Sequence, residues 1–380
     1  MNESSKKRLR PLMVVIMFQV VLVFLVHIAI ADSGNPEPRP AKEGHESSSE
    51  VGLANCRYGV ATLDIPQVDW VDDLGAGWYL NFGASTANAT NSAEFVPVIG
   101  VRQKKDANGN YLPTYSVTPP LTESGLGNLV DSKPNTLWIV GNEVDRGPDP
   151  GQTTGGQGDT FPDVYARAYH EVYHFIKQRD PTAQVANSAL VQVTPGRLKY
   201  LDLMWQAYKD EYGRVMPVDV WNMHLYILPE VTPAGQPNGI ANVALGTNPA
   251  LGRKESGGNS SLCPLPEVYC IAEHDDMNVF NEQVIAMRTW MRDNGQRNKP
   301  LILSEFSILY PYVDDGPTCW LEDEFGNCFT PQRVTNFLNS SFNYLKNPVD
   351  PNLGYPKDGN RLIQQSLWFS VNNQGAVGNV

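Results

Sequence analysis

Two glutamates each stand where a run of apolar residues ends. Glu143 follows apolar residues 137–140 in the segment LWIVGNEVDR, directly after Asn142, and Glu305 closes the segment LILSE. Such runs are typical of buried strands, so both carboxylates are expected at strand ends. Two carboxylates about 5 to 5.5 Å apart perform retaining glycoside hydrolysis, one as acid and base and the other as nucleophile. The structural alternatives are that Glu143 pairs with Arg146 and that Glu305 caps the following helix.

The segment HEVYH, residues 170–174, offers a different chemistry. It matches the H-E-x-x-H pattern of zinc metalloproteases, in which two histidines one helical turn apart bind the metal. On a helical wheel, the apolar residues of this stretch share one face, and His170 and His174 fall nearly opposite to it. Lys177 occupies the position where the longer metzincin motif requires glycine. We therefore interpret the histidines as part of a solvated helix face, with a zinc metalloprotease as a remote alternative.

The elements that must position the glutamates can be predicted from periodicity. Short runs rich in Val, Ile and aromatic residues predict eight strands. These runs cover residues 56–62, 77–83, 95–100, 136–143, 183–190, 218–226, 300–306 and 364–370. Amphipathic stretches between them predict helices that begin at Pro162, Asp275 and Pro331 and end near Asp180, Asn294 and Asn347. Eight strands alternating with helices predict an α/β fold, a (β/α)8 TIM barrel formed by a single catalytic domain over residues 51–380.

This barrel would bring the two glutamates together. The active site of a (β/α)8 barrel lies at the C-terminal ends of its strands. Glu143 ends the fourth predicted strand and Glu305 the seventh, so the two carboxylates can converge on one bond. The chain stops at Val380, soon after the eighth strand and without a clear final helix, which predicts either a C-terminal truncation or an unusual closure of the barrel.

The order of these motifs resembles the clan A (β/α)8 glycoside hydrolases. The shared features are Asn-Glu ending strand four, His-x-Tyr ending strand six (His224, Tyr226), a glutamate ending strand seven and a tryptophan near the end of strand eight (Trp368). The closer resemblance is to the Asl1-like group and glycoside hydrolase family one hundred and twenty-eight, whose strands two, three, four and seven carry W-Y-x-N-W, F-V-P-M, F-N-E-P and T-E-F. The corresponding segments here are Trp78-Tyr79-Leu80-Asn81-Phe82, Phe95-Val96-Pro97-Val98, Gly141-Asn142-Glu143-Val144 and Ser304-Glu305-Phe306.

The resemblance implies a role for each matching residue. Glu143 would be the general acid and base, and Glu305 the nucleophile. Asn142 would bond the sugar 2-hydroxyl, and Tyr226 would hold the nucleophile ionised. His224 and Asn81 are further substrate-binding candidates. The structural alternative for His224 and Tyr226 is that both are core residues whose polar groups are hydrogen-bonded within the protein. Aromatic side chains suit the apolar faces of sugars. The stacking candidates are Trp78, Trp221, Tyr310, Trp320 and Trp368. Some of them must belong to the core, and Trp221, which lies in the middle of a predicted strand, is expected there before the others.

Three departures from the family pattern bear on specificity. Val144 replaces the proline after the acid/base glutamate, Phe82 replaces the second tryptophan, and the loop over residues 227–276 is long and rich in Gly, Pro and Asn. The implied activity is retaining hydrolysis of a β-linked polysaccharide, a β-glucan by resemblance, with no cofactor and no metal. The alternatives are a carbohydrate-binding pseudoenzyme and a surface-anchored structural protein on the same barrel.

The first fifty residues indicate export. Lys and Arg at positions 6, 7, 8 and 10 precede an apolar run over residues 12–31, and Ala29-Ile30-Ala31 has the form of a cleavage site. Residues 1–31 are therefore a signal peptide or an N-terminal membrane anchor. Residues 32–50 lack apolar periodicity and are predicted to be a disordered linker. We expect a secreted or cell-surface protein. If the N-terminal segment is not cleaved, residues 12–31 tether the protein to the membrane.

Cysteine spacing and net charge agree with export. Cys263 lies close to Cys270, and Cys319 close to Cys328, which in an oxidising compartment predicts two local disulfides. A zinc site is the rival, but neither pair has C-x2-C spacing. Cys56 is expected to be free and buried at the start of the first strand. The net charge of −12 excludes a basic nucleic-acid-binding face, and we expect a monomer that binds a polysaccharide or oligosaccharide.

Overall fold

The computed structural model describes residues 55–62, 69–85, 90, 92–254, 262–265, 267–309, 319 and 321–371. They belong to a compact unit over Ala54–Val380. The predicted signal peptide or anchor and the predicted linker lie outside the described residues. Among the helices of the described part, none combines the length and the apolar character that a membrane span needs.

The described residues form ten strands in two hydrogen-bonded sheets. One sheet has the order β3-β2-β1-β10-β9-β8 and the other β5-β4-β6-β7. The strands in chain order are β1 (Asn55–Ala61), β2 (Ala76–Leu80), β3 (Glu94–Phe95), β4 (Val98–Lys105), β5 (Tyr111–Thr118), β6 (Leu137–Val140), β7 (Gln184–Asn187), β8 (Trp221–His224), β9 (Leu301–Phe306) and β10 (Gln365–Trp368). All pairs except β4–β5 are parallel.

The two sheets join into the predicted eight-position barrel. β3 and β4 are two parts of one barrel strand, interrupted at Pro97, which has no N–H to donate but whose carbonyl accepts from Ile139 at 3.0 Å. β3 pairs with β2 and β4 with β6, so the chain itself connects the sheets on this side. A parallel bridge between Ala186 and Val220 links β7 to β8 on the other. The fold class, α/β with parallel strands in the order of a (β/α)8 barrel, is confirmed.

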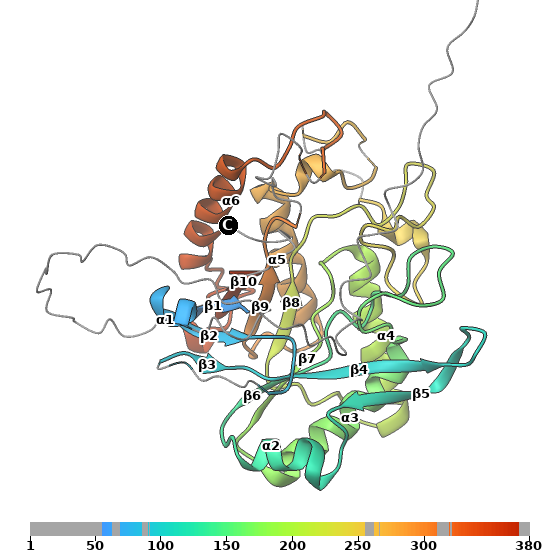
Figure 1. The fold of residues 1–380 in the computed structure, drawn as a ribbon, viewed down its shortest axis with the longest axis vertical. Helices are drawn as coiled ribbons and strands as arrows, with labels where there is room; N and C mark the ends of the chain where they lie inside the picture. Colours follow the sequence, from blue (N-terminus) through green and yellow to red (C-terminus); the bar gives the residue numbers. More distant parts are fainter. Residues whose placement is uncertain are drawn as a thin grey trace, which may run out of the picture. The chain divides into compact units, whose positions relative to one another are not determined.

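Helices pack around these strands (Figure 1). They are α1 (Asp69–Asp73), α2 (Asn128–Asp131), α3 (Pro162–Arg179), α4 (Pro195–Tyr212), α5 (Met277–Asp293) and α6 (Pro331–Lys346). Proline occupies the first turn of α3, α4 and α6, where its missing N–H costs no helical bond. Asp276 caps α5 by accepting from Asn278. The helix starts predicted from these residues are therefore confirmed to within two positions.

The strand β5 was not predicted. β4 continues beyond the barrel and pairs antiparallel with β5, forming a hairpin whose register sets Val101 opposite Val117. The turn is held by Asp106, whose carboxylate accepts from the backbone of Asn108 and Asn110. β5 is largely exposed, so it lacks the apolar run that marks a barrel strand. In Figure 1 the hairpin extends beside α3, and β5 contacts this helix.

The apolar core has an inner and an outer layer. Alternate residues of the barrel strands fill the interior, among them Trp78, Val98, Ile139, Ile302 and Leu367. A Cβ on Gly59 would lie 2.7 Å from the Trp78 ring, so glycine at the paired position makes room for this indole. The outer layer lies between strands and helices and includes Trp221, which is fully buried as predicted and packs against Trp205 and Trp290.

Candidate active site

Glu143 is presented by a tight turn directly after β6. Gly141 has a φ of +90°, and a Cβ there would lie 2.8 Å from Val144. Glu143 itself has a φ of +43°, an uncommon conformation for a residue with a side chain and one that concentrates at functional sites. Its N–H donates to the Ala189 carbonyl at 3.0 Å. The N–H of Val144 faces the Ser188 hydroxyl at 3.4 Å, a contact that proline at this position would lack.

Residues from two other strand ends, those of β8 and β9, converge on Glu143. His224 ends β8, and its Nδ1 lies 3.1 Å from Oε1 of Glu143 and 3.7 Å from Oε2 of Glu305. Tyr226, two residues after β8, donates its hydroxyl to Oε1 of Glu305 at 2.7 Å. All four side chains are buried, with Glu143 only 6% and Glu305 only 7% exposed. The structure thus assembles four residues that the sequence placed at strand ends.

The two carboxylates are close enough to act on one bond. Glu143, His224 and Glu305 each offer one ligand atom, and these atoms lie within 4.8 Å of one another. Inverting glycoside hydrolases need a separation of about 6.5–9.5 Å to admit a water, whereas retaining ones have about 5–5.5 Å. The spacing therefore fits retention. The same three atoms could surround a divalent cation, but the His224 nitrogen that faces both carboxylates is placed to donate a proton, because a carboxylate only accepts.

The electrostatics couple these groups. The pKa of Glu305 is raised to about 7, and burial is the largest cause; the His224 charge opposes the rise, the Glu143 charge adds to it and the Tyr226 hydroxyl opposes it. Burial alone would lower the pKa of His224, but the carboxylates of Glu305, Glu143 and Asp145 outweigh it and the pKa is raised. Because the pKa of Glu305 is about 7, the protonation of this cluster changes near neutral pH.

The other predicted substrate-binding residues differ in their surroundings. Asn142 is half-buried, and its side chain has no hydrogen-bond partner in the described part of the chain, so its amide is available to a ligand. Asn81 has a local role, since it accepts from the Gly83 N–H at 3.0 Å and donates to the Ser85 carbonyl at 3.1 Å. Tyr310 and Trp320 lie outside the described residues.

Two of the proposed stacking tryptophans are inaccessible. Trp78 is 1% exposed inside the barrel, and Trp368 is 2% exposed in the outer layer, where its ring contacts Phe306 and Phe342. Side chains alternate along a strand, so Leu367 points inward, Trp368 outward and the next residue inward again. A sugar-stacking role for Trp78 or Trp368 is therefore corrected to a role in packing.

The inward aromatic after β10 is Phe369, which the sequence analysis missed. Phe369 and Phe82, the residue that replaces the second tryptophan of the family motif, meet edge to face with ring centroids 5.7 Å apart. Both are half-buried and pack on the inner layer just beyond the ends of β10 and β2. If Trp368 had been recognised as an outward-facing residue, the alternation of side chains along the strand would have identified the next residue, Phe369, as facing inward. These two rings offer the apolar surface that the tryptophans were expected to supply.

A buried charge cluster behind Glu143 was also missed. Arg197, in the first turn of α4, bonds Asp145 through one guanidinium nitrogen and Glu230 through Nε at 3.1 Å, and all three side chains are fully buried. The guanidinium also donates to the carbonyls of Ala241 and Asn242 at 3.0 and 2.7 Å. Arg197 thus ties the turn that carries Glu143 to the long loop after β8. These contacts join residues far apart in the chain, which no local pattern indicates.

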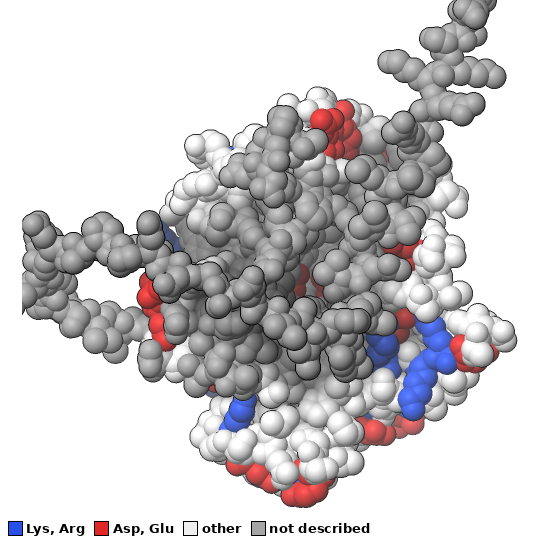
Figure 2. Space-filling view, viewed as in Figure 1, with Lys and Arg blue, Asp and Glu red and all other residues white. Residues whose placement is uncertain are grey.

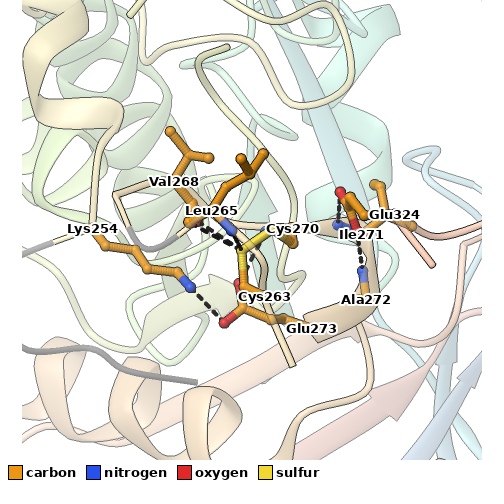
Figure 3. The surroundings of a disulfide bond; sticks show 9 residues. All are labelled: Lys254, Cys263, Leu265, Val268, Cys270, Ile271, Ala272, Glu273 and Glu324. Atoms are coloured by element: carbon orange, nitrogen blue, oxygen red, sulfur yellow. Dashed lines mark hydrogen bonds and ion pairs between the residues drawn. A yellow bond between two sulfur atoms is a disulfide. The ribbon is translucent and has the colours of Figure 1, made fainter. Parts of the chain in front are cut away.

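The cysteine predictions are confirmed except at Cys56. Disulfides Cys263–Cys270 and Cys319–Cys328 are present in the loops after β8 and β9. Figure 3 shows that Glu324, from the second loop, accepts from the N–H groups of Ile271 and Ala272 beside the first disulfide, each at 2.9 Å. Cys56 is free, as predicted, but exposed; it lies near the start of β1, before the ladder with β10 begins at residue 58.

The HEVYH histidines stabilise a contact between helices. The His170 ring stacks on Tyr212 of α4 with centroids 3.7 Å apart, and its Nδ1 lies 2.8 Å from the Tyr208 hydroxyl. Nε2 of His174 lies 2.8 Å from the Arg214 guanidinium, a cation that opposes a metal at that nitrogen. No third His, Cys, Asp or Glu of the described residues joins them. The histidines are half-buried, so the predicted fully solvated face is corrected to a packed one.

Among the described residues visible in Figure 2, charged side chains form separate groups and not one continuous patch. Blue Lys and Arg atoms form small groups next to red acidic ones, the largest lying where Figure 1 shows the β4–β5 hairpin. Several of these charges are paired across loops. Lys105 bonds Asp159 at 2.6 Å, and the Tyr111 hydroxyl donates to the same carboxylate at 2.6 Å, which fixes the hairpin to the segment between β6 and α3.

No family model and no curated protein sequence matches this chain. Several solved structures are similar to it over most of its length. A GH128 subgroup I endo-β-1,3-glucanase from Amycolatopsis mediterranei, in complex with laminarihexaose, is 13% identical with a TM-score of 0.46, over 83% of this chain and 89% of that one. A GH128 subgroup III curdlan-specific exo-β-1,3-glucanase from Blastomyces gilchristii, in complex with glucose, is 13% identical with a TM-score of 0.45, over 84% and 94%. A GH128 subgroup II endo-β-1,3-glucanase from Sorangium cellulosum is 16% identical with a TM-score of 0.44, over 86% and 94%.

Proposed function

We propose that this protein is an exported retaining glycoside hydrolase that acts on a β-linked polysaccharide. The observation that carries the proposal is the buried pair Glu143 and Glu305: one oxygen of each lies within 4.8 Å of the other, and Tyr226 bonds Glu305. Two such carboxylates at the C-terminal ends of barrel strands supply an acid/base and a nucleophile. The two disulfides favour an oxidising, extracytoplasmic compartment.

The residues divide the reaction into two displacements. Glu305 attacks the anomeric carbon to form a glycosyl-enzyme ester, while Glu143 transfers its proton to the departing glycosidic oxygen. Glu143 then takes a proton from water, whose oxygen attacks the same carbon and releases Glu305. Tyr226 occupies Oε1 of Glu305, which directs Oε2 to the sugar and stabilises the carboxylate before attack. His224 bonds Glu143 and supports the negative charge that it gains in the first step.

The remaining groups suit sugar binding. The free amide of Asn142 directly precedes the acid/base residue, where a bond to the sugar 2-hydroxyl would strengthen as the transition state forms. Phe82 and Phe369 present a half-buried apolar surface to a pyranose face. β-1,3-Glucan is the first polymer to test, because the motifs on four strands resemble the family named above.

Hydrolysis of a panel of β-1,3-, β-1,4- and β-1,6-glucans tests this proposal. We expect reducing ends to appear from at least one polymer, with rates unchanged by EDTA, because the mechanism uses no metal. Binding to a polymer without hydrolysis would instead indicate a carbohydrate-binding pseudoenzyme. Loss of activity in EDTA, restored by a divalent cation, would identify the Glu143–His224–Glu305 cluster as a metal site.

The pH dependence of hydrolysis should report Glu305. A carboxyl with a pKa raised to about 7 is protonated below that pH, and the protonated group cannot attack. We therefore expect kcat/KM to fall as the pH drops through about 7. The Tyr226 hydroxyl opposes the rise in the pKa of Glu305, so Tyr226→Phe should move this limb to higher pH by about one unit. An acidic limb that stays in place in Tyr226→Phe would contradict the assignment of Glu305 as nucleophile.

A further inference from the structure

His274 is a buried residue that the reaction scheme above does not use. It follows a short helical turn, η4 (Ile271–Glu273), in the loop between β8 and α5, and it is 1% exposed. Its Nδ1 lies 3.2 Å from the Ile227 carbonyl, and its Nε2 lies 2.9 Å from the Leu309 N–H. One imidazole therefore bridges the segments that leave β8 and β9.

The two backbone partners fix the protonation state of this imidazole. The Ile227 carbonyl only accepts and the Leu309 N–H only donates, so Nδ1 must carry the proton and Nε2 must be bare. A second proton would set Nε2–H against Leu309 N–H and remove the bridge. Burial lowers the pKa of His274 to about 4. The charged groups facing it, Asp275 beside it and Arg333 of α6, act in opposite directions, so burial dominates.

The bridged segments carry the pair that controls the nucleophile. Ile227 directly follows Tyr226, and Leu309 lies four residues after Glu305. The His274 ring also lies nearly parallel to the Tyr226 ring, at an interplanar angle of 12° and a centroid distance of 6.2 Å, and the Phe329 ring meets it edge-on at 5.6 Å. A side chain that holds residues 227 and 309 together thereby limits the distance between the Tyr226 hydroxyl and the Glu305 carboxylate.

His274 is itself held from the far side by the disulfide loops. Glu273 accepts from the Cys270 N–H at 2.9 Å and pairs with Lys254 at 2.5 Å, as Figure 3 shows together with the Glu324 bonds to η4. Arg333 donates to the Ala272 carbonyl at 3.1 Å. The turn before His274 is thus anchored by a disulfide and by ion pairs, which leaves the imidazole little freedom to shift away from Tyr226.

We propose that neutral His274 is a positioning residue for the proposed nucleophile, because it bridges Ile227 and Leu309 and so holds Tyr226 against Glu305. This inference rests on the proposed function only for its kinetic consequence. It predicts that a side chain unable to bridge the two segments loosens the Tyr226–Glu305 hydrogen bond and raises the proton affinity of Glu305. It also predicts that an amide that still accepts from Leu309 brings the behaviour back towards that of the wild type.

The test compares His274→Ala, His274→Asn and His274→Gln. Glutamine extends to the position of Nε2, so it can accept from Leu309, whereas asparagine ends near Nδ1 and alanine reaches neither. We expect alanine and asparagine to raise the pKa of Glu305 by about one unit and to lower kcat by about tenfold with KM little changed. Glutamine should bring both values back towards wild type. His174→Gln, a change on α3 between helices, is the matched control and should alter neither.

The readout separates this inference from the proposed function. The Glu305 carboxyl resonance, assigned by its loss in Glu305→Gln, can be titrated in 13C-labelled protein whether or not any glucan is hydrolysed. A folded alanine or asparagine variant whose Glu305 titrates as in wild type would overturn the positioning role. If alanine does not fold, the difference between asparagine and glutamine decides the matter. A wild-type protein that hydrolyses no glucan would defeat the proposed function and leave the titration result standing.

Discussion

Glu305→Gln is expected to abolish hydrolysis of every glycoside, including those with highly activated leaving groups. Glutamine cannot form the glycosyl-enzyme ester, so no choice of leaving group compensates for its loss. We expect kcat to fall by at least about ten-thousand-fold, beyond what the loss of proton transfer alone would cause. The substitution keeps an acceptor for the Tyr226 hydroxyl, so the surrounding hydrogen bond should survive. Initial rates on a dinitrophenyl glycoside and on a glucan polymer measure the effect.

Glu143→Ala should behave differently because its role is proton transfer. The first displacement needs an acid only when the leaving group is basic, so the alanine variant should still form the covalent intermediate from a dinitrophenyl glycoside. Its breakdown needs a base, which a small anion such as azide replaces by attacking the ester directly. We expect added azide to restore turnover and to yield a glycosyl azide of retained configuration, identified by NMR of the product.

These two variants also provide the controls for each other. Equal losses in Glu305→Gln and Glu143→Ala, with no azide rescue, would show that the roles are not divided as proposed. A wild-type product of inverted configuration would contradict the retaining mechanism, although the close approach of the two carboxylates argues against it. Thermal unfolding of both variants establishes that they are folded, which matters because the replaced groups are buried.

The strands could be predicted because their signal is local. Each barrel strand is an apolar run followed by a polar residue, and in a (β/α)8 barrel the C-terminal ends of the strands lie at one face. That rule predicted that Glu143 and Glu305 converge, without any knowledge of distances, and the family resemblance added His224 and Tyr226. Their mutual contacts at 2.7–3.1 Å show that the convergence extends to hydrogen bonding.

The orientation of aromatic residues could not be predicted in the same way. Whether Trp368 or Phe369 faces the site depends on which alternate residues of β10 point inward, and the register against β1 and β9 sets this. Trp78 similarly lies opposite Gly59, which leaves room for an indole inside the barrel. A motif gives the residue type and an approximate position. Neighbouring residues of a strand point to opposite faces, so an error of one residue assigns a core side chain to the site.

The sequence indicated neither the β4–β5 hairpin nor the buried cluster around Arg197. The β4–β5 hairpin has a polar, exposed second strand, so it lacks the period that identifies an element. Arg197 and its two carboxylate partners are separated by more than thirty residues, with |i−j| values of 52 and 33. Charged residues are normally expected on the surface, and only their mutual proximity explains why these three are buried.

Arg197→Met is expected to cause the largest loss of stability in the molecule. Methionine fills much of the same volume but leaves Asp145 and Glu230 buried without their shared cation. Breaking a buried ion pair by removing one partner costs about 3–5 kcal/mol, because the remaining charge has neither solvent nor a counterion. One oxygen of each carboxylate already has no hydrogen-bond partner. Glu230 also accepts from Gln192 and Thr194, each at 2.7 Å, but both donors are neutral and neither replaces the cation.

The pH dependence of this loss identifies its cause. Burial raises the pKa of Asp145 even with Arg197 present, and removal of the cation should raise it further. A carboxyl whose folded-state pKa is raised destabilises the protein as the pH rises, so the deficit of Arg197→Met should be small near pH 4 and full at pH 8. Urea unfolding at both pH values measures it. Adding Asp145→Asn and Glu230→Gln to Arg197→Met removes the buried charges and should recover most of the stability at pH 8. A deficit that is equal at both pH values, and that persists in the triple variant, would assign the loss to packing and not to charge.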